Sequence, residues 1–164
     1  RRTACPEGAT GWRRARYAFE AVNHHELALI LLGVGIFLIS IDATNLTGLW
    51  TFVILWLMRQ SAKLNIFFGV LNLNENFLPN HLKYLQTYFR RRPMNFLMPI
   101  SILGSFIFVV PLWGGALTSG VLPHEIVSST ILATLLSLAI LEHVLLVLPV
   151  QIEFLWKWGF RHES

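Results

Sequence analysis

The chain has 164 residues, of which 54% are hydrophobic and only 13% are charged. Soluble domains usually carry about 25% charged residues, so the composition excludes an ordinary water-soluble domain and favours the lipid bilayer as a partner. The net charge is +4, but no basic face with interleaved aromatic residues is visible, which argues against nucleic-acid binding. The single cysteine, Cys5, excludes a disulfide framework within the chain.

Four apolar runs predict helices that cross a membrane, which takes about 20 consecutive and mostly apolar residues. We therefore expect an all-α fold, a polytopic transmembrane bundle of four spanning helices that forms one integral membrane domain over residues 1–164. The first residue is Arg and no signal segment precedes the first run, so we expect the chain to be part of a longer product. The four predicted spans are residues 22–41, 47–70, 94–115 and 124–148.

The positive charges predict an orientation for these spans. Eleven of the thirteen Lys and Arg residues lie in three segments, and none lies in the connections 42–46 and 116–123. Because Lys and Arg accumulate on the cytoplasmic side of membrane proteins, we expect these three segments to face the cytoplasm. They are residues 1–21, 71–93 and 150–164.

The second of these segments contains its own periodic pattern. Apolar residues such as Leu82, Leu85 and Phe89 recur at spacings of three and four, with polar residues such as Lys83 between them. This pattern predicts an amphipathic helix over residues 77–89, lying in the membrane surface. The helix could serve only as a linker, or it could present a docking face to a partner.

Charged residues inside the second span need partners, because each costs about 2.5–3.5 kcal/mol near the centre of a spanning helix. Arg59 and Lys63 are four residues apart and therefore share a helix face. The acidic residues of the first and fourth spans are expected at a similar depth. We therefore expect an intramembrane charge cluster that joins three helices, composed of Glu26, Arg59, Lys63, Asn65 and Glu142.

Three histidines border this cluster and leave a functional alternative open. Neutral imidazole is a common metal ligand, including for the magnesium of a chlorin, so His25 or His143, with His24 beside the former, could bind a bacteriochlorophyll. A di-iron carboxylate site would repeat Glu-x-x-His on two helices, and this spacing does not occur in the sequence. We expect neither a metal site made by the protein alone nor a catalytic constellation, and so not an enzyme.

Several motifs are distinctive in combination. SAKLNIFFGV at 61–70 is followed by NLNE at 72–75, FLPNHLKYL at 77–85 and YFRRRPMN at 88–95. Together with NHHELA at 23–28 and LEH at 141–143, these motifs make the chain resemble the PuhE-type photosynthetic complex assembly proteins of anoxygenic phototrophic bacteria. The resemblance covers about residues 4–158. Members of that family carry a proline where Leu71 stands here, and they are longer, with additional spans.

The resemblance implies a setting and no particular reaction. It implies a protein of the bacterial inner membrane, in its intracytoplasmic photosynthetic form, that helps assemble the reaction centre–light-harvesting 1 complex or stays bound to it. Genes of the family accompany those for the reaction centre's H subunit and for bacteriochlorophyll synthesis. Two alternatives therefore stay open: a bacteriochlorophyll-binding carrier, and a subunit of a bacteriochlorophyll-biosynthesis enzyme.

Overall fold

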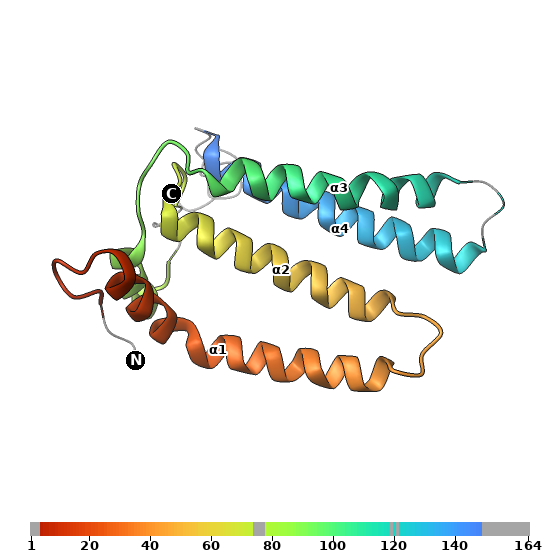
Figure 1. Cartoon of the computed structure of the whole chain (residues 1–164), viewed down its shortest axis with the longest axis horizontal. Helices are drawn as coiled ribbons and strands as arrows, with labels where there is room; N and C mark the ends of the chain where they lie inside the picture. The colour runs from red at the N-terminus through yellow and green to blue at the C-terminus, as the bar shows by residue number, and fades with distance from the viewer. Residues whose placement is uncertain (1–3, 74–77, 119, 121, 149–164) are drawn as a thin grey trace, which may run out of the picture.

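The computed structural model describes residues 4–73, 78–118, 120 and 122–148. Within them the chain forms four α-helices and one 3₁₀-helix and no strand, apart from an isolated bridge between Val70 and Arg91 (Figure 1). The all-α prediction is thus confirmed for these residues. The elements are α1 (Gly11–Ser40), α2 (Thr47–Phe68), η2 (Asn80–Tyr88), α3 (Leu97–Leu117) and α4 (Pro123–Val147).

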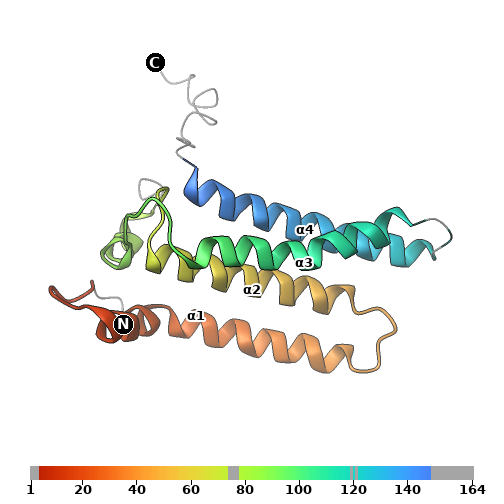
Figure 2. The ribbon, with the colours of Figure 1, turned by 45° about the horizontal axis from the view of Figure 1, so that its top comes forward.

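The four α-helices lie alongside one another. The end of α1 and the beginning of α2 lie at the same end of the bundle as the end of α3 and the beginning of α4 (Figures 1 and 2). The N-terminal segment and η2 lie at the opposite end. The helices therefore run up, down, up and down, which is the topology that short connections impose on neighbouring helices.

Three helices are long and apolar enough to cross a membrane, namely α1, α3 and α4. The prediction of four spans is not supported in this respect, because α2 does not meet the same criterion. The reason lies in its second half, where Arg59, Gln60, Lys63 and Asn65 lower the mean hydropathy of an otherwise apolar helix. The three apolar helices are those of a membrane protein, because their exposed aliphatic side chains need a lipid environment.

Packing is closest between α3 and α4, while α2 packs on α4 and α1 packs mainly on α2. Helix α4 has a buried stripe with helical periodicity, which contacts α3 and α2. In α1, by contrast, Glu26 is the one buried residue. The stripe of α4 consists of Leu132, Ala133, Leu136, Ala139, Ile140 and His143.

Two helix boundaries differ from the prediction for local reasons. Helix α1 begins at Gly11, well before residue 22, because its first turns pack against η2. Helix α2 ends at Phe68, because Gly69 adopts a φ of 120°, a conformation that favours glycine. Asn72 then donates its amide hydrogens to the carbonyl oxygens of Leu145 (3.1 Å) and Leu148 (2.7 Å), which closes the end of α4.

The predicted amphipathic helix exists, but it is a 3₁₀-helix over Asn80–Tyr88 and not an α-helix. Tyr88 is buried and Leu82 half-buried, whereas Lys83 is exposed, so the two faces differ in polarity as predicted. The start of the prediction, residue 77, lies outside the described residues, as does the predicted cytoplasmic tail 150–164.

Arg14 connects the first turns of α1 to the segments around them. Its guanidinium donates hydrogen bonds to the carbonyl oxygens of Phe67 (3.1 Å) and Tyr88, and it lies 4.3 Å from the centre of the Phe67 ring. The backbone N–H of Cys5 donates to Thr87 Oγ1 at 2.8 Å. Burial, followed by the proximity of Cys5, raises the pKa of the Tyr88 phenol, which therefore stays neutral at physiological pH.

The close approach of α1 to α2 depends on Gly33. A Cβ at this position would lie 2.5 Å from Phe52 Cε1, whereas a Cβ at Gly35 would meet no atom within 4 Å. Both glycines lie inside the same helix, so both alanine variants gain the same helix propensity, about 1 kcal/mol. We expect Gly33→Ala to be less stable than Gly35→Ala by about 1–3 kcal/mol, measured by denaturant unfolding in detergent micelles. Equal stabilities would show that Gly33 does not set this contact.

Candidate functional site

The polar residues of α2 occupy two different faces of the helix. Gln60 and Lys63 point toward α1, while Ser61 and Asn65 point toward α3 and α4. The spacing explains this division, because consecutive residues of an α-helix are about 100° apart. One helix thus joins two polar clusters, both in the half of the bundle away from the short connections.

The first cluster is an ion pair between Glu26 and Lys63. Lys63 Nζ contacts Glu26 Oε1, and Gln60 Nε2 donates to Glu26 Oε2, so both carboxylate oxygens are occupied. The Glu26 side chain is 12% exposed and the Lys63 side chain 31% exposed. Because Glu26 is the buried residue of α1, this pair connects the middle of α1 to α2, as Arg14 connects its first turns to Phe67 and Tyr88.

The other two charges of the predicted cluster lie elsewhere. Arg59 and Glu142 are both exposed, and neither forms an ion pair with any residue in the part of the chain that the structure describes. For Glu142 the helix geometry gives the reason: its neighbour His143 is on the buried stripe of α4, so Glu142 is turned away from it. The structure therefore brings together Glu26 and Lys63 and leaves Arg59 and Glu142 outside.

The second cluster is a chain of hydrogen bonds centred on His143. The His143 side chain is fully buried, with Nδ1 at 2.9 Å from the carbonyl oxygen of Ala139 and Nε2 at 2.9 Å from Ser61 Oγ. Ser61 Oγ lies 2.8 Å from Ser101 Oγ, and Asn65 Nδ2 lies 3.2 Å from the same Ser101 oxygen. The cluster connects α4, α2 and α3 through an imidazole, two hydroxyl groups and an amide.

The carbonyl of Ala139 fixes the direction of these hydrogen bonds. A carbonyl oxygen only accepts, so Nδ1 of His143 carries a hydrogen, and Nε2 of the neutral imidazole is an acceptor. Ser61 then donates to Nε2, Ser101 donates to the carbonyl oxygen of Leu97 at 2.9 Å, and Asn65 donates to Ser101.

Two asparagines, Asn65 and Asn95, extend the second cluster toward the beginning of α3. Asn95 donates to the carbonyl oxygens of Asn65 (3.1 Å) and Gly69 (2.9 Å) and accepts from the N–H groups of Leu97 and Met98. Asn95 thereby closes the end of α2 and caps the beginning of α3. The oxygen of the fully buried Asn65 side chain has no hydrogen-bond partner among the described residues.

The three histidines of the predicted pigment site lie in two different environments. Both ring nitrogens of His143 are occupied, so a magnesium ligand role would require Ser61 to leave Nε2. His24 and His25 are exposed on α1, where the structure gives neither ring an orienting hydrogen bond. Among the described residues no group of three His, Cys, Asp or Glu side chains could hold a metal ion.

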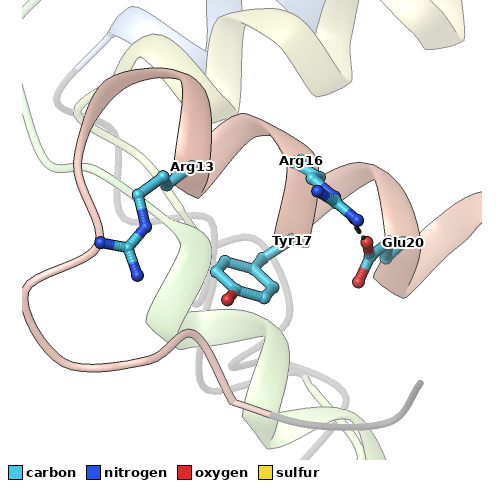
Figure 3. Close-up of a pocket in the computed structure, with 4 residues that line it drawn as sticks. All are labelled: Arg13, Arg16, Tyr17 and Glu20. Atoms are coloured by element: carbon cyan, nitrogen blue, oxygen red, sulfur yellow. Dashed lines mark hydrogen bonds and ion pairs between the residues drawn. The ribbon is translucent and has the colours of Figure 1, made fainter.

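A separate, charged notch lies on the first turns of α1 (Figure 3). It has a volume of about 240 Å³ and is lined by Arg13, Arg16, Tyr17 and Glu20. Arg16 pairs with Glu20 at 3.0 Å, as expected for residues four apart on a helix, while Arg13 extends away from that pair. Such an exposed pair adds little stability.

Ser61, Ser101 and Asn95 belong to the second cluster and were not predicted from the sequence. Serine is common at helix–helix contacts in membranes, so the small residues at 61, 101 and 105 on facing helices were the available signal. His143 and Asn65 were predicted as site residues. However, His143 was expected to bind a pigment, and Asn65 was expected in the charge cluster.

The ion pair predicts that replacing Lys63 will lower the stability of the protein more than replacing Arg59. We expect Lys63→Met to lower the free energy of unfolding by about 2–4 kcal/mol, since it leaves the Glu26 carboxylate without its charged partner. Arg59→Met is the matched control, because Arg59 is exposed and unpaired in the described structure; it should change stability by less than about 1 kcal/mol. Denaturant unfolding in lipid-like micelles would compare them, and equal losses would contradict the assignment.

The hydrogen-bond chain predicts a cost for removing its central hydroxyl. Ser61→Ala leaves Nε2 of the buried His143 without a donor, which should lower the free energy of unfolding by about 1–3 kcal/mol. The control is Ser129→Ala on α4, a half-buried serine with no hydrogen bond to the described residues. Denaturant unfolding in micelles would again compare the two variants. If Ser61→Ala lost no more stability than Ser129→Ala, the hydrogen bond from Ser61 to His143 would be refuted.

Comparison with known proteins gives a family and one informative relative. The family described as "Protein of unknown function (DUF3623)" matches residues 1–164. The "Uncharacterized 30.4 kDa protein in puhA 5'region" of Rhodobacter capsulatus is 36% identical over 161 residues. This similarity covers 96% of the chain and 57% of that protein, so the chain spans little more than half the length of this relative. No solved structure matches the chain.

Proposed function

The chain belongs to the DUF3623 family, and we propose that it is a non-enzymatic membrane accessory protein of bacterial photosynthesis. It assists assembly of the reaction centre–light-harvesting 1 complex or stays bound to it, as the sequence's resemblance to PuhE-type assembly proteins implies. The observation that carries the proposal is the relative named for the region 5' of puhA, a photosynthesis gene region.

The proposal includes α2 as a fourth span. Helix α2 has 22 residues and lies between α1 on one side and α3 and α4 on the other. Its polar residues Gln60, Ser61, Lys63 and Asn65 turn toward these neighbours, where Glu26 and His143 contact them. Arg59 is exposed, and its long side chain would extend toward the membrane surface. Exposed leucines such as Leu55 and Leu57 face outward. A helix can cross a membrane with such residues when they face the bundle interior.

The basic segments give the proposed orientation. The segments 1–21 and 71–93 contain nine of the Lys and Arg residues, and their described parts, 4–21, 71–73 and 78–93, lie at one end of the bundle. This favours the cytoplasmic side of the bacterial inner membrane for that end. The notch at Arg13 and Arg16 and the 3₁₀-helix η2 would then lie at the level of the lipid headgroups. Partner subunits would meet the protein at this end.

Bacteriochlorophyll binding is not part of the proposal. His143 is fully buried, and its Nε2 is hydrogen-bonded to Ser61. His24 and His25 are exposed, and neither ring has a hydrogen bond to the described residues that would orient it. An accessory role through protein contacts requires neither histidine as a ligand.

Deletion of the complete gene in a phototrophic host would test the proposal. We expect the yield of the reaction centre–light-harvesting 1 complex, measured by its membrane absorption, to fall several-fold and to recover when the full-length gene is restored. The Arg59→Met variant serves as the matched control and should restore the yield as well as the wild type. An unchanged yield, together with no trace of the protein in the purified complex, would overturn the proposal.

A further inference from the structure

A groove runs between α2 and α3 and opens toward the surrounding lipid. It forms because both helices pack chiefly on α4 and only slightly on each other. Its volume is about 650 Å³, within the range of small-molecule sites in proteins. The groove is lined by apolar residues, among them Trp50, Val53, Leu57, Ile100, Phe108 and Leu136, and by four serines.

The groove contains no charged residue, and its polar groups are concentrated at one end. Ser61 and Ser101 lie there with Ser105, while the rest of the lining is apolar apart from Ser129. Ser61 is seven residues before the end of α2 and therefore about 10 Å from that end along the helix axis. A phospholipid headgroup, which stays at the membrane surface, would not reach this depth, so the lining suits a neutral molecule with a weakly polar group.

The hydrogen-bond chain determines which polar group would fit. With Nε2 of His143 as an acceptor, the hydroxyl hydrogen of Ser61 points to Nε2, and that of Ser101 points to the carbonyl oxygen of Leu97 at 2.9 Å. The Ser105 hydroxyl donates to the carbonyl oxygen of Ser101 at 2.7 Å. All three hydrogens are thus used within the protein, and the oxygens of Ser61 and Ser101 that line the groove are available as acceptors.

We propose that the α2–α3 groove binds a neutral, membrane-dissolved alcohol, with its apolar body along Trp50–Leu57 and its hydroxyl donating to Ser101 Oγ. The proposal is independent of the photosynthetic role, because it rests on the groove and on the direction of the His143 hydrogen bonds. A carbonyl or an ether of the same shape would fit the groove but would find no free donor at its end.

The test compares a tritiated isoprenoid alcohol, geranylgeraniol, with its methyl ether as competitors for the full chain in nanodiscs. The ether keeps the oxygen and the apolar body but cannot donate a hydrogen bond. We expect the alcohol to bind about threefold to tenfold more tightly than the ether, as one added hydrogen bond would give. Equal binding of the two compounds, or displacement of the alcohol by a phospholipid headgroup analogue, would overturn the proposal.

Protein variants then locate the site. Ser101→Ala should remove the preference for the alcohol, while Ser129→Ala, at the apolar end of the groove, should keep it. The Gly104→Leu variant blocks the groove without removing a hydrogen-bonding group. A Cβ at Gly104 meets no atom within 4 Å, and the leucine side chain would fill the groove. It should abolish binding of both compounds, and unchanged binding would place the ligand elsewhere and refute the assignment.

Discussion

The rest of the structure depends on how the polar half of α2 is satisfied. A charged or amide side chain in a hydrocarbon environment costs several kcal/mol unless it finds a partner. Lys63 finds Glu26 on α1, and Ser61 and Asn65 find His143 on α4 and Ser101 on α3. These partners come from all three other helices, so satisfying one helix fixes the relative positions of the four.

The two polar clusters have different physical consequences. The Glu26–Lys63 pair connects α1, a helix with little other packing, to the bundle, and its geometry leaves the apolar surface of α1 exposed to lipid. The His143 chain contains no carboxylate, lysine or arginine, and it lies beside the groove between α2 and α3. The first cluster therefore stabilises the contact between α1 and α2. The second determines which hydrogen-bond acceptors line the groove that we propose as a ligand site.

Periodicity and charge were enough to predict the helices, but they were insufficient for the partners within the site. Apolar runs gave the four α-helices, and the spacing of Arg59 and Lys63 suggested a shared face. Spacing could not show that Glu142 turns outward, because this depends on His143 occupying the buried stripe of α4. Nor could it reveal Ser61 and Ser101, which are ordinary residues in the sequence and matter only because α2 and α3 meet there on α4.

The central claim is that α2 crosses the membrane with the polar residues of its second half, apart from Arg59, turned toward its neighbours. Single cysteines along α2, in a Cys5→Ser background, would measure this most directly with a water-soluble and a lipid-soluble maleimide. Replacements at the exposed Leu57 and Leu64 should react only with the lipid-soluble reagent, one at the buried Ala62 with neither, and one at Asn45 in the connection with the water-soluble reagent. Rapid reaction of the Leu57 replacement with the water-soluble reagent would contradict the claim.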